Sequence, residues 1–277
     1  MSITQNERAV RFRALHEGPG VFVIPNPWDV SSARVLASLG FKALATSSAA
    51  SAAALGRTDG GLTREETLAH ARLIVDATDL PVSADLEKGF GDSPEVVAET
   101  IRLAAEVGLV GCTIEDATHD QDRPLYDFGL AVERIAAAAQ AAHSLPFPFV
   151  LTARAHNLLY PPASLDDTVR RLQAFEKAGA DVLFAPGLPD LAAVRAVCEV
   201  VSKPVNFMVG MKGKSFSVSE LAAAGVRRIS LATSLYRAAM TGFLAAANEV
   251  IDNGQFGFLE RCVTTPELNT LMRIGLR

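Results

Sequence analysis

Two carboxylates stand one residue apart where an apolar segment of the chain ends. The stretch PVSADLEKGFGD passes from apolar residues into Asp85 and Glu87, the next apolar segment, LVGCTIED, carries Glu115, and the one after it, FPFVLTAR, ends with Arg154. An acid in such a position also commonly caps a helix or faces solvent, so a structural role stays open for Asp85 and Glu87 taken alone. Three acids and an arginine on consecutive segments favour a functional site, because like charges this close repel one another and are costly to desolvate.

A hard divalent cation would offset both costs, and Mg²⁺ typically takes one or two carboxylates together with water and substrate oxygens. We therefore expect Mg²⁺, with Mn²⁺ as the alternative, near Asp85, Glu87, Glu115 and Asp59, the last lying in the loop after the second apolar segment. Arg154 presents a fork of donors that binds a carboxylate in bidentate fashion, so it is the expected substrate anchor.

Two histidines and one further acid lie close to these residues and could transfer protons. His119 and Asp120 follow the fourth apolar segment, and His156 lies two residues beyond Arg154. We expect His119 to be the catalytic acid or base, although all three are also common loop residues. A Schiff-base mechanism is disfavoured, because the sixth apolar segment, DVLFAP, contains no lysine.

The segments that carry these residues alternate with helical patterns. Short apolar segments typical of buried parallel strands lie at 20–25, 41–47, 80–86, 109–116, 147–154, 180–186, 203–209 and 227–233. Amphipathic helices follow them, for example at 63–78, 94–108, 165–179 and 217–225. Eight strand–helix units predict an α/β fold, a (β/α)₈ TIM-type barrel, whose functional groups gather at the carboxyl ends of the strands.

A single domain is expected over 1–277, with the barrel at about 20–252 and a C-terminal helical tail at 253–277. The eighth unit continues through a long helix at 233–254, and the tail is expected to add one or two short helices that cap the barrel or pack on a partner subunit. PNPWDV follows the first strand where an open dinucleotide-binding sheet would carry a glycine-rich turn, which disfavours that fold.

The composition excludes several classes of protein. The chain is 49% hydrophobic and 21% charged with a net charge of −5, so it indicates a well-buried protein without a nucleic-acid surface. No segment has the length of a membrane span or the pattern of a signal peptide. Three distant cysteines, Cys112, Cys198 and Cys262, form neither a disulfide framework nor a zinc motif, which favours the reducing cytoplasm.

Several motifs, in order along the chain, resemble those of the isocitrate lyase/phosphoenolpyruvate mutase superfamily. They are NPWDVSSA, GFKALATSS, ADLEKGFG, GCTIEDA, LTAR, GADVLFAPGL and KPVN, and they cover about residues 20 to 240. The resemblance implies an α/β barrel with additional C-terminal helices whose last helix is exchanged between subunits, giving a homodimer or homotetramer. It also implies a Mg²⁺ enzyme that acts on a small 2-oxo carboxylate or its enolate.

The resemblance also implies roles for the acids. Asp85 matches the principal metal ligand, Glu87 the second acid of an acid-x-acid pair, Glu115 the acid on the next strand and Asp59 the acid in the loop after strand two. Arg154 matches the substrate arginine.

Four further residues complete the expected substrate site. Thr46, Ser47 and Ser48 resemble the segment whose backbone N–H groups bind the carboxylate of the oxo acid. Asn206 is the polar residue at the end of the seventh strand. The loop 210–215, with two lysines, could bind phosphate, but a solvated turn is the simpler interpretation.

The departures from the superfamily pattern bear on the reaction. Isocitrate and methylisocitrate lyases carry Lys-x-Cys-Gly-His after strand four, whereas this chain reads THDQDRPLYDF and has no cysteine there. The chain therefore resembles the phosphorylmutase-like and oxaloacetate decarboxylase-like branch more than a true isocitrate lyase. Specificity is expected to lie in the long loops at 47–62 and 117–129.

Three functions stay open. The first is a Mg²⁺-dependent lyase or decarboxylase that cleaves a C–C bond of a small 2-oxo or 2-hydroxy dicarboxylate through a pyruvate-like enolate. The second is a P–C bond enzyme, either a phosphonopyruvate hydrolase or a phosphonomutase. The third is a non-catalytic barrel that binds a small acid.

Overall fold

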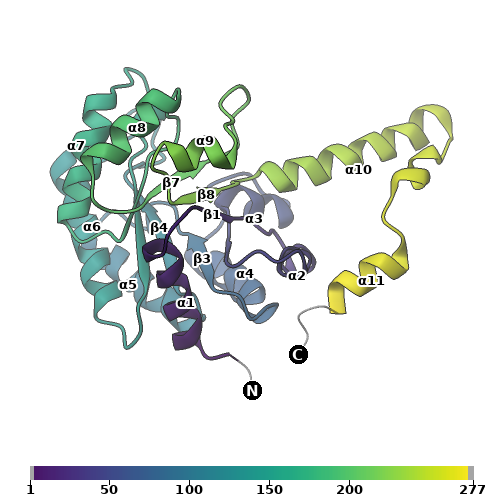
Figure 1. Ribbon diagram of the computed structural model, residues 1–277, viewed down its shortest axis with the longest axis horizontal. Coiled ribbons are helices and arrows are strands. Elements are labelled where there is room, and N and C mark those ends of the chain that lie inside the picture. The colour runs from purple at the N-terminus through teal and green to yellow at the C-terminus, as the bar shows by residue number, and fades with distance from the viewer. Residues whose placement is uncertain (1–2, 274–277) are drawn as a thin grey trace.

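Eight parallel strands form a barrel that is covered outside by helices (Figure 1). The computed structural model describes residues 3–273. The strands are β1 (Phe22–Ile24), β2 (Leu44–Ala45), β3 (Val82–Asp85), β4 (Gly111–Glu115), β5 (Val150–Arg154), β6 (Val182–Phe184), β7 (Val205–Met208) and β8 (Arg228–Ser230). Each strand lies inside one of the eight apolar segments, so the predicted (β/α)₈ TIM-type barrel is confirmed.

Helices connect the strands in the alternation that the sequence predicts. They are α2 (Val30–Ser38), α3 (Ser48–Ala54), α4 (Arg64–Asp76), α5 (Pro94–Glu106), α6 (Phe128–His143), α7 (Leu165–Lys177), α8 (Leu191–Val200) and α9 (Val218–Ala223), with a 3₁₀ turn, η1, at Asn157–Leu159. Gly108 and Gly179 follow α5 and α7 with φ of 91° and 105°, a conformation that costs glycine little. The segment 47–62 differs from the expected irregular loop, because its alanine-rich first half forms α3.

The barrel is closed at a seam between its first two strands. β1 pairs with β8 and β2 pairs with β3, whereas β1 and β2 are joined by one backbone hydrogen bond from the Ala45 N–H to the Pro25 carbonyl, 3.0 Å. The Asn26 side chain reinforces this seam. Its amide donates to the Thr46 carbonyl at 3.0 Å and its oxygen accepts from the Leu231 N–H at 2.9 Å, which ties the ends of β1, β2 and β8 together.

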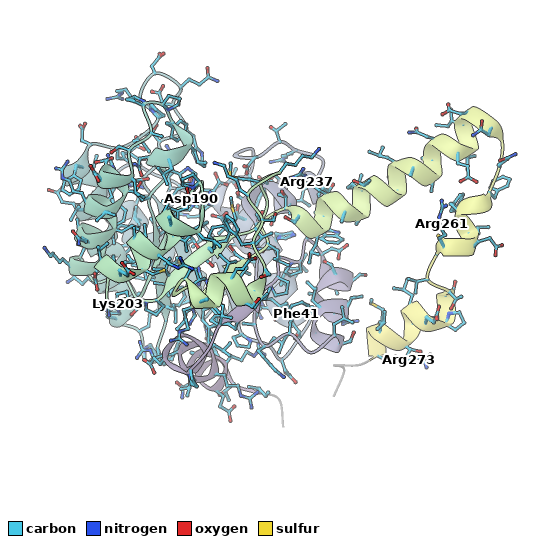
Figure 2. The ribbon with its side chains drawn as sticks, turned by 45° about the horizontal axis from the view of Figure 1, so that its top comes forward. Phe41, Asp190, Lys203, Arg237, Arg261 and Arg273 are labelled. Carbon is cyan, nitrogen blue, oxygen red and sulfur yellow. The ribbon has the colours of Figure 1, made fainter. Side chains whose placement is uncertain are left out.

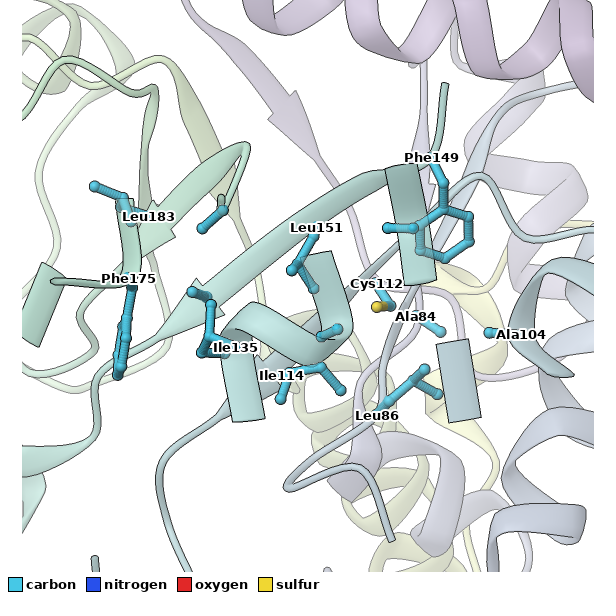
Figure 3. Close-up of a cluster of buried hydrophobic side chains, with 14 of the residues drawn as sticks. Ala84, Leu86, Ala104, Cys112, Ile114, Ile135, Phe149, Leu151, Phe175 and Leu183 are labelled. Carbon is cyan, nitrogen blue, oxygen red and sulfur yellow. The ribbon is translucent and has the colours of Figure 1, made fainter. Parts of the chain in front are cut away.

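The main hydrophobic core lies between the strands and the surrounding helices. Figure 3 shows Cys112 and Ile114 of β4 beside Leu151 of β5, with Ile135 of α6 close by. Because successive strand residues point to opposite faces, the residues between them, such as Thr113, point into the barrel. The barrel interior therefore keeps room for polar side chains while its outer face is apolar.

An N-terminal helix that the sequence did not predict closes the bottom of the barrel. Helix α1 (Gln5–Glu17) begins with a capping box in which Thr4 and Glu7 satisfy each other's backbone N–H groups. Its Phe12 is fully buried against the amino-terminal ends of the strands. A Cβ on Gly111 would lie 2.8 Å from the Phe12 ring, so glycine permits this close contact.

His16 at the end of α1 makes the fold sensitive to acid. Its Nδ1 contacts the Phe12 carbonyl at 2.8 Å, and its Nε2 lies 3.4 Å from Arg228 Nη1 inside the barrel. Burial, followed by the Arg228 charge, lowers the pKa of His16 to about 3. The imidazole is thus neutral in the folded protein, whereas in the unfolded chain it binds a proton below about pH 6.5.

The free energy of unfolding should therefore fall by roughly 1.4 kcal/mol per pH unit below pH 6.5, and this loss should continue toward pH 3. His16→Gln, which keeps a donor and an acceptor, should flatten this dependence. Urea unfolding at pH 7.0, 5.5 and 4.5 measures it. Equal slopes for the variant and the natural sequence would contradict the assignment.

The C-terminal helices leave the barrel. Helix α10 (Ser234–Asn253) extends away from it, and η2 (Gly257–Arg261) and α11 (Thr265–Arg273) lead back until α11 contacts α2 (Figure 1). Figure 2 shows Arg237 where α10 leaves the barrel and Arg261 out on the tail. The predicted long helix and the short helices after it are confirmed.

No residue of α10 is buried, and Phe243 and Ile251 are 62% and 79% exposed. Across residues 3–273, no helix has the length and apolar character needed to cross a membrane. The three cysteines are free thiols, and only Cys112 is buried.

Candidate active site

Every residue predicted for the site lines one of two adjoining cavities at the carboxyl ends of the strands. The first cavity, of about 230 Å³, is lined by seven of them: Thr46, Ser47, Ser48, Asp59, Asp85, Arg154 and Asn206. The second, of about 430 Å³, adds Glu87, Glu115 and His119 and shares Arg154 and Asp59 with the first. Apolar residues from β6 and β7, Phe184 and Met208, complete the first cavity.

Glu115 and Arg154 face each other because β4 and β5 pair in register at these positions. The Arg154 guanidinium Nη1 lies 3.2 Å from Glu115 Oε2 and 3.6 Å from Asp85 Oδ2. On its other side, Arg154 Cζ lies 4.8 Å from the centre of the ring of Phe184, the residue of β6 that pairs with Arg154. The guanidinium is therefore fixed between a buried carboxylate and an aromatic face.

Glu115 also contacts two histidines. His119 Nε2 lies 2.9 Å from Glu115 Oε1, and His156 Nε2 lies 3.1 Å from Glu115 Oε2. Burial alone would raise the pKa of Glu115, but Arg154, His156 and the hydrogen bond with His119 hold it well below its ordinary value. The same hydrogen bond raises the pKa of His119, so its protonated form is favoured beside the cavity.

Asp85 is a carboxylate whose charge is compensated only in part. Its backbone N–H donates to Thr46 Oγ1 at 3.2 Å, which fixes the end of β3 against β2. Burial raises the pKa of Asp85, with the Arg154 charge opposing and the Glu115 charge adding to this effect. A partly buried carboxylate with a raised pKa provides a favourable position for a cation.

Glu87 lies beside Asp85 on a constrained backbone. Its φ is 51°, which is uncommon outside glycine, and its N–H donates to Asp85 Oδ1 at 3.2 Å. Glu87 Oε2 lies 3.4 Å from His119 Nδ1. Burial and the neighbouring Asp85 charge raise the pKa of Glu87 to about 7. The loop after β3 thus holds a second carboxylate toward the cavity.

A buried arginine of α6 fixes this loop. Arg134 is 1% exposed, and its guanidinium donates to the backbone carbonyls of Lys88, Gly91 and Asp92, the Gly91 bond measuring 2.7 Å. The Tyr126 ring packs 4.0 Å from Arg134 Cζ, and the Tyr126 hydroxyl donates to Asp92 Oδ1 at 2.5 Å. Arg134 therefore positions the turn that carries Glu87.

Replacing Arg134 with Met should leave three buried carbonyls without their donor, so the free energy of unfolding should fall by about 3 kcal/mol. Mg²⁺ affinity should fall about tenfold, as expected when a group that orients a ligand is lost. Urea unfolding and calorimetric Mg²⁺ titration measure both effects.

Arg102→Met is the matched control, because Arg102 lies on α5 with a side chain 54% exposed and pairs with Glu99. It should change the free energy of unfolding by less than about 0.5 kcal/mol. An Arg134→Met protein that unfolds at the same urea concentration as this control would refute the positioning role.

The loop residues lie at the rim. Ser47 and Ser48 begin α3, whose first N–H groups have no acceptor within the helix, and both serines line the first cavity. Asp59 is exposed and lines both cavities. Lys214 of the loop 210–215 contacts the Gly187 carbonyl at 3.4 Å, a loop–loop contact.

Asp116 was not predicted for the site, but it orients the segment after β5. Its Oδ1 accepts from the His156 N–H at 2.8 Å, and its Oδ2 accepts from Arg171 Nη1 of α7 at 2.9 Å. His156 is thereby held against Glu115, although its ring nitrogens make no hydrogen bond of good geometry within the described chain. Only the adjacency of Asp116 to Glu115 in the sequence pointed to it.

The donor set fits a divalent cation at Asp85 and Glu87. Burial, together with neighbouring negative charge, raises the pKa of both, whereas Glu115 already has three nitrogen partners. Within residues 3–273 no group of three or more His, Cys, Asp or Glu side chains forms a ready-made metal cluster. Mg²⁺ does not require one, because water and substrate oxygens supply its remaining ligands.

Comparison with known proteins agrees with this geometry. The sequence model of the phosphoenolpyruvate phosphomutase family matches residues 12–251. The crystal structure of a candidate lyase/mutase from Burkholderia cenocepacia J2315 is 52% identical, covers 96% of this chain and 95% of that one, and superimposes with a TM-score of 0.94.

Two curated enzymes are more distant. The 2-methylisocitrate lyase of Escherichia coli (strain K12) is 29% identical over 86% of this chain and 82% of its own length. The 2,3-dimethylmalate lyase of Eubacterium barkeri is 28% identical over 95% of this chain and 93% of its own length. The family match spans most of the barrel, and the chain therefore belongs to the isocitrate lyase/phosphoenolpyruvate mutase superfamily.

Proposed function

We propose that this protein is a Mg²⁺-dependent lyase or decarboxylase that cleaves a C–C bond in a small 2-oxo or 2-hydroxy dicarboxylate. The members of its superfamily are C–C lyases of small carboxylates or P–C bond enzymes. The observation that carries the proposal is the fixed Arg154 guanidinium, which lies 3.6 Å from the partly buried carboxylate of Asp85 at the wall of a small cavity. A cavity of about 230 Å³ suits a small acid, since sites for drug-sized ligands run from about 300 to 1,000 Å³.

Each residue has a proposed role. Arg154 binds the substrate carboxylate adjacent to the reacting carbon, and the N–H groups at Ser47 and Ser48 add donors to it. Asp85 is the principal ligand of Mg²⁺, and Glu87 is the second, directly or through water, with Asp59 at the rim. Mg²⁺ supplies electrostatic stabilisation of the negative charge that develops on the oxo oxygen.

Glu115 and His119 would act as a pair. When the C–C bond of a 2-oxo substrate such as oxaloacetate breaks, CO₂ leaves, the electron pair enters the pyruvate-like enolate, and the enolate carbon then takes up a proton. In a 2-hydroxy substrate the hydroxyl group loses its proton and pyruvate forms as the ketone. The electron pair then passes to the carbon of the other fragment, which takes up the proton. His119 is the proposed proton donor, because its hydrogen bond with Glu115 stabilises its protonated form. Glu115 would also keep Arg154 in place.

A substrate panel tests the proposal. Oxaloacetate, 2,3-dimethylmalate, 2-methylisocitrate and phosphonopyruvate each yield pyruvate on cleavage, and lactate dehydrogenase with NADH reports it. Pyruvate release that requires Mg²⁺ and stops with EDTA is expected from one of the first three. Binding of these acids without any turnover would instead support the non-catalytic barrel.

The second candidate is a P–C bond enzyme, which the match to the phosphoenolpyruvate phosphomutase family favours. Phosphorus NMR distinguishes the two chemistries. Phosphonopyruvate would give inorganic phosphate through hydrolysis or phosphoenolpyruvate through rearrangement, whereas an unchanged phosphorus signal would favour C–C cleavage.

The tail supports a homo-oligomer, either a dimer or a tetramer. Helix α10 projects from the barrel with apolar side chains such as Phe243, Leu244 and Ile251 exposed, and a second copy of the chain could cover them. Light scattering coupled to gel filtration measures the assembly. A monomer at micromolar concentration would contradict it.

A further inference from the structure

The interior of the barrel contains an arginine that the proposed reaction does not use. Arg228 of β8 is 4% exposed and lines the same cavity as Arg154, on the side toward the barrel floor. It points inward because strand residues alternate, and Ile229 after it packs in the outer core. The cavity therefore has one guanidinium at its rim and another at its floor.

The partners of Arg228 are neutral. Its Nε donates to Asn206 Oδ1 at 2.8 Å, and its Nη1 lies 3.4 Å from His16 Nε2. His16 is uncharged, because burial followed by Arg228 itself lowers the pKa of the imidazole to about 3. Among the residues that the structure describes, no carboxylate pairs with Arg228, although Arg154 and Arg171 are both paired with acids.

An isolated buried charge is costly unless something compensates it. Burial lowers the pKa of Arg228 only to about 9, so the guanidinium is positive at neutral pH. Asp59 and Asp85 line the same cavity, but neither forms an ion pair with Arg228. The natural compensation is therefore a negative group that enters the cavity from solvent.

The Ser230 hydroxyl beside Asn206 is arranged to assist such an anion. Ser230 Oγ accepts from Asn206 Nδ2 at 3.0 Å, which leaves the serine proton free to donate elsewhere. Ser230 lines the cavity.

We propose that Arg228, with Asn206 and Ser230, binds a second carboxylate of the substrate at the floor of the cavity. Arg154 binds the first carboxylate at the rim, so the site selects dianions over monoanions. This inference rests on the proposed function for the identity of the rim carboxylate. It makes Arg228 a specificity-determining residue of that site.

Direct binding tests the inference without requiring turnover. Calorimetry with Mg²⁺ present would compare malonate, succinate and glutarate with butyrate, a monoanion of the same length as succinate. We expect at least one of the three diacids to bind roughly tenfold or more tightly than butyrate, because a missing partner leaves buried donors unsatisfied. No preference in the natural protein would overturn the proposal.

Variants then assign the preference to Arg228. Arg228→Met should remove it, and Arg228→Lys, which keeps the charge, should retain part of it. Arg227→Met is the matched control, since Arg227 is the neighbouring arginine but donates to the Gly18 and Gly20 carbonyls at the outer edge of the barrel. It should weaken the fold and leave the preference unchanged.

A folded Arg228→Met protein with an undiminished preference would refute the proposal. If this variant fails to fold, Arg228→Lys carries the test. A full preference in Arg228→Lys, or a loss of preference in Arg227→Met as large as that in Arg228→Lys, would then refute the proposal. A preference that depends on Arg228 would stand even if the substrate panel showed no cleavage, so the two proposals fail separately.

Discussion

Replacing Asp85 with Asn should abolish Mg²⁺-dependent turnover, with kcat falling by about 10³-fold or more, while the barrel stays folded. The loss is large because the amide removes the negative charge that attracts the cation, and the cation contributes several kcal/mol of transition-state stabilisation. Stability should hold or rise, since burial raises the pKa of Asp85 and its charge is therefore unfavourable in the metal-free fold.

The measurement pairs a pyruvate-release assay with thermal unfolding in EDTA. Asp76→Asn is the matched control, because Asp76 is an exposed acid at the end of α4 that pairs with Arg72. It should leave kcat, Mg²⁺ affinity and Tm unchanged. Retained activity in Asp85→Asn, or a Tm well below that of the control, would refute the assignment of Asp85 as the principal ligand.

Replacing Arg154 with Met should lower kcat/KM by about 10³-fold, and Arg154→Lys should lower it by about 10²-fold. Lysine keeps the charge but loses the fork that binds a carboxylate at two points and the planar face that stacks on Phe184. Arg154→Met also leaves Glu115, with a side chain 4% exposed, without its cationic partner. The free energy of unfolding should fall by about 3 kcal/mol, since a buried charge loses its partner.

A double-mutant cycle separates these effects. Glu115→Gln alone should destabilise the fold, but the double variant with Arg154→Met should be less destabilised than the sum of the two single changes, because neither partner is then left charged and unpaired. Steady-state kinetics and urea unfolding on the four proteins supply the cycle. Additive losses in stability would show that the two side chains do not depend on each other.

The strands could be predicted because each buried segment is continuously apolar, and the rim residues followed because strand ends share one edge of a parallel barrel. The positions of Asp85, Glu115 and Arg154 at the rim could be predicted in this way. Their contacts with one another could not, because strand register pairs Glu115 with Arg154 and no single segment encodes register.

Other features gave weak signals in the sequence. Helix α1 has little amphipathic pattern, because its contact with the barrel depends on a few residues such as Phe12 and His16. Arg228 sits in an apolar strand beside Arg227, where either arginine could have pointed inward. Arg134 contacts backbone carbonyls, and backbone acceptors have no side-chain signature. Such contacts depend on tertiary structure that local patterns do not specify.

The seam between β1 and β2 has a consequence for how the protein is made. Because β1 pairs along its length with β8, its partner strand is translated about 200 residues later, and α1 packs on strands that are also synthesised after it. The segment from β2 to β7 can pair strand by strand as it leaves the ribosome, whereas β1 has no partner along its length until β8 is made. The β1 strand thus stays open to chaperones and proteases until Arg228–Ser230 emerge.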